Sequence, residues 1–220
     1  VGVGKNFSLL DKFFFKLSFR YIDDIYVRDQ QSALNLEANF SRKAKIIPDI
    51  AYFLPKVLPE VYKEQSAYLI SPVEYSVFKR YYQEVGGVFL NEDEYIHNWI
   101  EAINDSMDKE KISKIYLAAT TINDLNFTKV LFDRLKSYPN SQKNIQLIKN
   151  VDLDEYISLL HKCQSVLSGR MHALILGHSI GLKVLPYKIS QKIESYQKEY
   201  LQYDADYFRE KLIELRAEIL

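Results

Sequence analysis

The sequence has almost no cysteine and no net charge, and both shortages limit what the protein can be. Cys163 is the only cysteine among 220 residues. It excludes an internal disulfide and a cysteine-rich zinc site, and it favours a reducing, cytosolic compartment. Lysine plus arginine equal aspartate plus glutamate at 29 each, so the chain lacks the basic field that holds nucleic acid. Any binding site for an anion must therefore depend on a local group of basic residues.

Long apolar runs are absent as well. No stretch approaches the length of a membrane span, and no repeat or low-complexity tract is present. The start, Val1 to Gly4, shows neither an initiator methionine nor a signal-peptide pattern. We therefore expect this sequence to begin within a larger protein. With 47% hydrophobic residues, the composition is that of a globular protein that buries a core.

From about residue 67 onward, short β-branched or aromatic runs alternate with longer amphipathic stretches. This alternation is typical of a parallel sheet covered by helices. The expected strands are 67–70, 115–119, 145–148, 165–167 and 183–185. The expected helices are 92–107, 126–137, 153–163, 171–178, 190–200 and 206–219. Asp124 or Asn126 and also Asp152 are predicted N-caps, and Gly181 is predicted to follow a helix end.

The first 55 residues form a smaller group that looks like the end of another alternating α/β domain. We expect helices at 9–21 and 30–38 and strands at 24–27 and 45–47. Leu54–Pro59 contains two prolines, which disfavour helix and sheet alike, and it is the predicted linker. The predicted organisation is therefore residues 1–55 as the C-terminal part of an N-terminal domain, followed by residues 56–220 as a Rossmann-like domain.

The densest group of chemistry-bearing residues is Ser165–Leu174. A predicted strand ends here, Gly169 allows a tight turn, and a helix begins, so Arg170 and His172 are expected at the carboxyl end of a strand. Open α/β sheets bind ligands at that edge, and a helix start attracts anions. Arginine suits carboxylate or phosphate, and histidine can exchange a proton near neutral pH. A loop-capping arginine and a structural histidine explain this pattern about equally well.

Three segments together resemble the polysaccharide pyruvyl transferase family. The first is Ser168–Leu176, which carries Arg170-Met171-His172 and is followed by Gly181–Tyr187 and Lys192. The others, in the family's order, are Val27–Ala33, which contains an Arg-Asp-x-x-Ser motif, and Ile47–Leu54. The resemblance covers nearly the whole chain as short motifs. The glycine-rich segment with which the family normally begins has no match here.

This resemblance implies a fold like that of GT-B glycosyltransferases and transfer of pyruvate from phosphoenolpyruvate to a sugar, with no metal or organic cofactor. Arg170 and Arg28 would neutralise the donor's phosphate and carboxylate, and His172 would be the general acid. The remaining substrate-binding residues by resemblance are Ser168, Gly169, Met171, Asp49, and Lys192 or, if the register slips, Lys188. The acceptor would be a glycan or a lipid-linked oligosaccharide of a cell-surface polysaccharide.

Two other functions stay open at this stage: a glycosyltransferase of the same architecture that uses a sugar nucleotide, and a non-catalytic glycan-binding member of the family. Gly177–Gly181 fits the G-x-S-x-G formula of hydrolases but lacks the strand before it and the helix after it. Gly2-Val3-Gly4 lacks the third glycine of a dinucleotide fingerprint, because Phe7 stands at that position.

Leu9–Arg20 is predicted to be an amphipathic helix. Lys12, Lys16 and Arg20 share one face, and Leu10, Phe13, Phe14 and Leu17 share another. We expect the apolar face to pack on the core. The alternative is a peripheral contact with an anionic membrane, at whose inner face lipid-linked acceptors reside.

Overall fold

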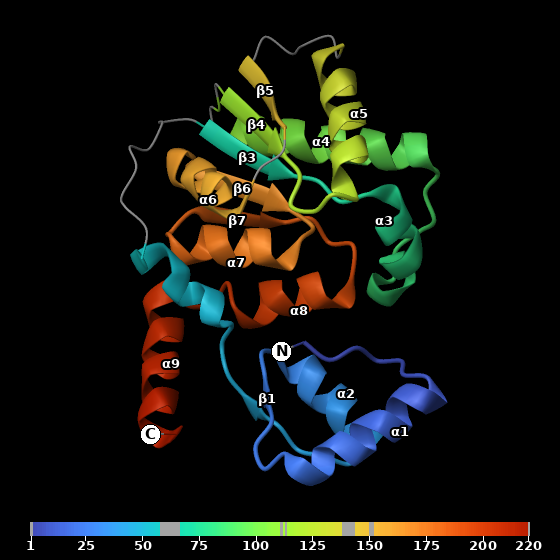
Figure 1. Ribbon diagram of the computed structural model, residues 1–220. Helices are drawn as coiled ribbons and strands as arrows, with labels where there is room; N and C mark the ends of the chain where they lie inside the picture. Colours follow the sequence, from blue (N-terminus) through green and yellow to red (C-terminus); the bar gives the residue numbers. More distant parts are fainter. Residues whose placement is uncertain are drawn as a thin grey trace.

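The computed structural model describes residues 2–57, 67–110, 112, 114–137, 144–149 and 152–219. Its larger part is a parallel sheet of five strands flanked by helices (Figure 1). A smaller N-terminal unit lies below helix α8 in that view. The predicted α/β class is confirmed.

The five strands are β3 (Ala67–Ser71), β4 (Lys114–Ala118), β5 (Asn144–Ile148), β6 (Ser165–Ser168) and β7 (Lys183–Pro186). Each lies within one residue of its predicted bounds. The strand order is β5-β4-β3-β6-β7, so the chain builds outward from β3 in one direction and then returns to add β6 and β7 on the other side. The topological switch point, where such sheets bind ligands, therefore lies between β3 and β6.

The sheet's side chains alternate between two core layers. Tyr68 and Ile70 of β3 pack with helices α4 (Glu92–Glu110), α5 (Asp124–Lys136), α8 (Gln191–Glu199) and α9 (Ala205–Ile219). Ala67 and Leu69 pack on the other face with α6 (Leu153–Lys162) and α7 (Met171–Ser179). Because β3 is buried on both faces, its sequence is continuously apolar or aromatic up to Ser71.

All six predicted helices of this part are present. The prediction missed α3 (Tyr75–Tyr81) and the 3-10 turn η3 (Tyr82–Val85), which are too short to show a helical period. Asp152 caps α6 as predicted, and Gly181 follows α7 with a φ of 75°. The predicted cap of α5 is wrong. Asn123 occupies the N-cap position without a side-chain bond, because Asp124 has other partners.

Gly177 allows α7 to lie close against β6. A Cβ added at this position would stand 2.5 Å from Cγ1 of Val166. We expect Gly177→Ala to lower the free energy of unfolding by about 1–3 kcal/mol, because the helix and the strand must move apart. Urea unfolding measures the loss. Gly4→Ala is the control, since its Cβ meets nothing within 4 Å, and an equal loss in both variants would contradict the close approach.

The close packing of α7 on β6 also explains why Gly177–Gly181 matches the G-x-S-x-G formula. Ser179 is the last residue of α7, and its buried hydroxyl donates to the Leu176 carbonyl at 2.7 Å. A helix precedes this serine and a strand follows it, the reverse of a nucleophile elbow. The segment therefore serves helix packing.

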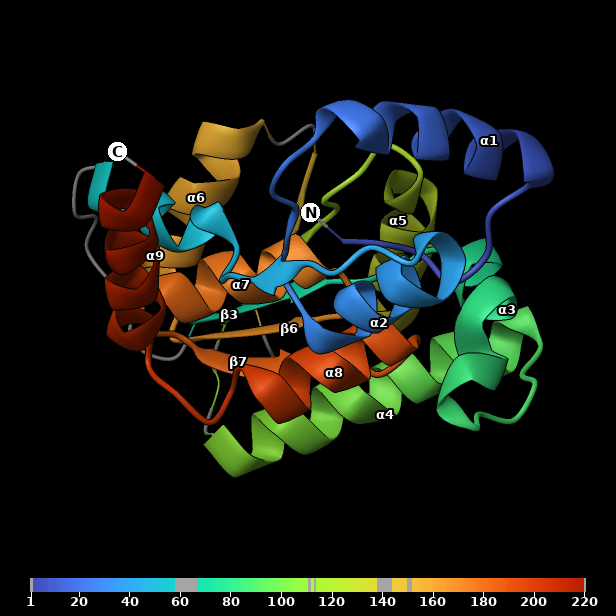
Figure 2. The same cartoon turned by 90° about the horizontal axis from the view of Figure 1, so that it is seen from below.

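The N-terminal unit contains α1 (Leu9–Ser18), the 3-10 turn η1 (Phe19–Tyr21), β1 (Tyr26–Val27), α2 (Gln30–Phe40) and β2 (Lys45–Ile46). Strands β1 and β2 pair in parallel and α2 connects them, which is the expected alternating pattern. Seen from below, the unit lies in front of α7 and α8 (Figure 2).

The predicted linker is partly wrong. Ile50–Val57 forms a 3-10 helix, η2, although the prolines of Leu54–Pro59 disfavour regular structure; residues 58 and 59 lie outside the described part of the chain. Tyr52 of η2 is fully buried, stacks on Phe208 of α9 at 4.7 Å and accepts a hydrogen bond from Arg209. Tertiary packing therefore holds a segment whose local propensity is poor.

Helix α1 does not pack on the core as expected. None of its residues is buried: Phe15 contacts Phe40 of α2, whereas Leu9 and Leu10 are 87% and 70% exposed. Among the described residues, no helix combines the length and the apolar character that a membrane crossing requires.

Candidate functional site

The side chain of Arg170 is held by a buried carboxylate. Its Nε and Nη2 donate to the two carboxylate oxygens of Asp124 at 2.9 and 2.6 Å. Asp124 is fully buried, and it also accepts from the Thr121 hydroxyl at 2.7 Å and the Glu74 amide at 3.0 Å. The bidentate pair uses one edge of the guanidinium and leaves its remaining N–H donors for other partners.

Ser168 fixes the backbone beside Arg170. Its buried hydroxyl donates to the Ser71 carbonyl at 2.8 Å and accepts from the Arg170 amide at 2.9 Å. These bonds join the carboxyl ends of β3 and β6 at the switch point. The next residue is Gly169, and a side chain does not fit at this position because a Cβ would lie 2.9 Å from Cγ2 of Val73. Two of the predicted site residues thus have a clear part in shaping the turn.

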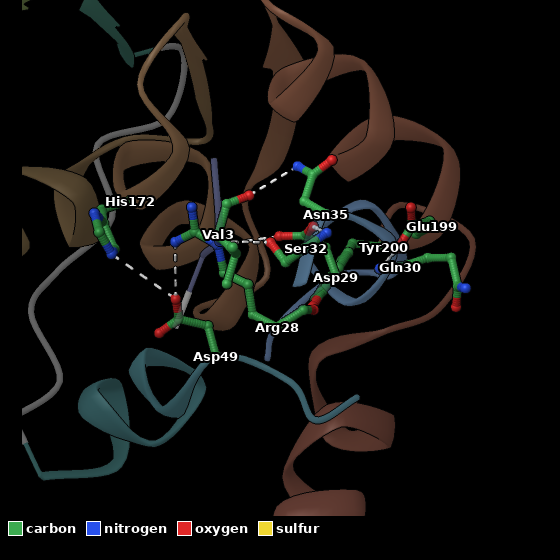
Figure 3. Close-up of polar contacts among 10 residues, drawn as sticks. All are labelled: Val3, Arg28, Asp29, Gln30, Ser32, Asn35, Asp49, His172, Glu199 and Tyr200. Carbon is green, nitrogen blue, oxygen red and sulfur yellow. Dashed lines mark hydrogen bonds and ion pairs between the residues drawn. The ribbon is translucent and has the colours of Figure 1, made fainter. Parts of the chain in front are cut away.

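Three other predicted residues come together beside this turn: Arg28, Asp49 and His172 (Figure 3). Oδ2 of Asp49 lies 3.4 Å from Nη1 of Arg28 and 3.8 Å from Nε2 of His172. The side chains of Arg28 and Asp49 are each 15% exposed, whereas that of His172 is 69% exposed. The carboxylate therefore lies between a mostly buried guanidinium and an imidazole that is open to solvent.

The loop between β1 and α2 supports Arg28. Asp29 caps α2 by accepting from the Ser32 amide at 2.7 Å, and its other oxygen lies 3.5 Å from Nε of Arg28. The N-terminal segment covers the guanidinium closely, since a Cβ on Gly2 would approach it to 3.0 Å. In the Arg-Asp-x-x-Ser motif, the aspartate therefore caps the start of α2 and also contacts the side chain of the arginine.

A cavity of about 540 Å³ lies between the N-terminal unit and the part of the chain that contains the five-stranded sheet, here called the sheet domain. Its volume lies within the range of about 300–1,000 Å³ that is usual for small-molecule sites. The N-terminal segment contributes Lys5, the β1–α2 loop contributes Asp29, and the sheet domain contributes Arg170, Met171 and Lys192. Positively charged side chains from both parts of the chain thus line the same cavity.

The structure divides the predicted site residues into two neighbouring groups. Arg170 and Lys192 line the cavity, and Arg28, Asp49 and His172 form the cluster that adjoins it through Asp29. Among the described residues, Lys188 and His172 are not part of the cavity wall. Of the two alternative lysines, Lys192 is therefore the one placed to meet a ligand there.

Sequence reasoning missed three residues that organise the site: Asp124, Glu199 and Tyr200. The sequence predicts Asp124 only as a helix cap, although an acidic residue shortly after a buried strand is a signal for the ligand-binding edge of the sheet. Burial raises the pKa of the Tyr200 hydroxyl and of the Glu199 carboxyl. Within the part of the chain that the structure describes, no group of three or more His, Cys, Asp or Glu residues could hold a metal ion.

Comparison with known proteins gives one family and one general fold. The family model described as polysaccharide pyruvyl transferase matches residues 1–190. A solved structure assigned as a UDP-N-acetylglucosamine 2-epimerase from Listeria monocytogenes aligns with a TM-score of 0.55 and 13% identity, over 90% of this chain and 52% of its own. This chain thus spans about half the length of that protein, and the likeness supports the GT-B-like fold alone.

A structure of POFUT1 in complex with GDP aligns more weakly, with a TM-score of 0.37 and 7% identity over 73% of this chain and 50% of its own. The search of curated proteins gave no significant match.

Proposed function

Because the chain belongs to the polysaccharide pyruvyl transferase family, we propose that it transfers pyruvate from phosphoenolpyruvate to a pair of hydroxyls on a glycan sugar. The observation that carries this proposal is the cluster of Arg28, Asp49 and His172 beside a cavity that Arg170 and Lys192 line. Phosphoenolpyruvate bears two anionic groups, and each needs a fixed cation, because they repel one another on so small a ligand.

The reaction requires a proton donor and a vacant site for a sugar. One sugar hydroxyl attacks the carbon that bears the phosphate, while His172 delivers a proton to the methylene carbon. The bond between this carbon and the phosphate oxygen then breaks, and the phosphate leaves with the proton of the first hydroxyl. A second hydroxyl adds to the same carbon to close the ketal, and its proton returns His172 to the protonated form. Solvent exposure of His172 supports this role because the imidazole can reach a ligand and regain its proton afterwards.

The cations have separate parts in this scheme. Arg28 and the free donors of Arg170 bind the phosphate and carboxylate, and Lys192 adds a further phosphate contact. Asp49 orients Arg28 and the imidazole by lying between them. A glycan or lipid-linked oligosaccharide enters from the side of the N-terminal unit, and the cavity volume accommodates part of a sugar next to the small donor.

Phosphate release tests the proposal directly. The intact protein is incubated with phosphoenolpyruvate and a panel of glycan acceptors, and inorganic phosphate and the mass of the glycan are measured. We expect phosphate release that depends on one class of acceptor and a product that carries a pyruvate ketal. Consumption of a sugar nucleotide, with no response to phosphoenolpyruvate for any acceptor, would overturn the proposal.

A further inference from the structure

Helix α8 of the sheet domain contacts the loop that carries Arg28. The hydroxyl of Tyr200, just after α8, donates to the backbone carbonyl of Arg28. Oε2 of Glu199 accepts from the Gln30 amide at 3.4 Å. At the other end of α8, Gln191 donates to the side chain of Gln31 at 3.3 Å. Figure 3 shows the first two contacts on the side of Arg28 away from His172.

Tyr200 is rigidly placed within the sheet domain. Its ring stacks on Phe208 at 4.8 Å and on Tyr196 at 5.2 Å, and only 7% of the residue is exposed. Burial raises its pKa, so the hydroxyl keeps its proton at neutral pH and remains a donor. The Arg28 carbonyl therefore meets a hydrogen-bond donor with little freedom to move.

Arg28 has weak support from its own strand. It follows β1, which has two residues and pairs only with the two-residue β2 among the described strands. So short a pair contributes little stability by itself. A contact from the larger domain can thus decide where the Arg28 backbone lies relative to Arg170 and His172, which belong to that domain.

We propose that Tyr200, assisted by Glu199, is a positioning residue that sets the place of Arg28 across the boundary between the two parts of the chain. Tyr200 acts through the Arg28 backbone and does not touch the donor itself. The inference rests on the proposed function, because it takes Arg28 as a ligand of phosphoenolpyruvate. It goes beyond that function in assigning a role to α8.

Tyr200→Phe removes the hydroxyl and keeps the ring stack. We expect the Kd and the KM for phosphoenolpyruvate to rise about three- to tenfold, the effect of one lost hydrogen bond, with a smaller change in kcat. Calorimetry measures the Kd, and phosphate release gives KM and kcat. Tyr196→Phe is the matched control: it removes a buried hydroxyl from the same stack, one that faces His178 at 3.3 Å, and should leave Kd unchanged.

A double-mutant cycle separates positioning from a general loss of stability. In an Arg28→Ala background, Tyr200→Phe should cause no further rise in Kd, because the residue that it positions is gone. An equal rise in both backgrounds, or a Kd for Tyr200→Phe equal to that of the wild type, would overturn the inference alone. Wild-type protein that bound no phosphoenolpyruvate would overturn the proposed function and this inference together.

Discussion

His172→Ala is expected to lower kcat for acceptor-dependent phosphate release by about 10²–10⁴-fold, the usual contribution of a positioned general acid. Binding of phosphoenolpyruvate should change much less, since the cations that hold its charges remain. Comparison of kcat with the calorimetric Kd measures the two effects separately.

The fold should tolerate this substitution because the His172 side chain is 69% exposed. We expect the urea midpoint of the variant to equal that of the wild type. His97→Ala is the matched control, because His97 is also an exposed helical histidine with one carboxylate partner, Glu101 at 3.3 Å. Full activity of His172→Ala would remove His172 as the general acid of the scheme, and a different proton donor would have to be assigned.

Asp124→Ala is expected to lower the free energy of unfolding by about 3 kcal/mol or more. The substitution leaves Arg170, whose side chain is 26% exposed, without its bidentate partner, and breaking one side of a buried pair typically costs about 3–5 kcal/mol. It also removes the acceptor of the Thr121 hydroxyl and the Glu74 amide. Urea unfolding measures the loss.

An exposed pair of the same type provides the control. Arg134 donates to Asp93 at 2.9 Å, but their side chains are 58% and 80% exposed, so Asp93→Ala should cost at most about 1 kcal/mol. A double variant, Asp124→Ala with Arg170→Met, should recover part of the lost stability because no uncompensated charge remains. If both single variants lost the same stability, burial of Asp124 would not matter to the pair.

Local patterns were enough to predict most of the fold. The five strands and the six helices were recognisable because short β-branched or aromatic runs alternate with longer amphipathic stretches, in which the residues of one helix face repeat every 3.6 positions. The Arg170–His172 segment was correctly placed where a strand gives way to a helix, since a glycine turn between two periodic segments is visible in a single stretch of sequence. Helix α3 was missed because seven residues hardly show a period.

The partners within the site needed long-range information. Arg170 meets Asp124 from 46 positions away, and Tyr200 reaches the Arg28 backbone from 172 positions away. Nothing in the local sequence distinguishes Lys192 from Lys188. Lys192 is on α8 and Lys188 is on the loop before it, and only the packing of this segment in the fold decides that Lys192 lines the cavity.

The sequence by itself therefore determined the order of strands and helices, and it placed a guanidinium and an imidazole at the edge of the sheet. The tertiary structure alone decided that Arg170 is held by a buried carboxylate and that His172 faces Asp49 and Arg28. The physical reason is that backbone periodicity is a property of neighbouring residues, whereas the direction and charge partners of a side chain depend on how distant segments pack.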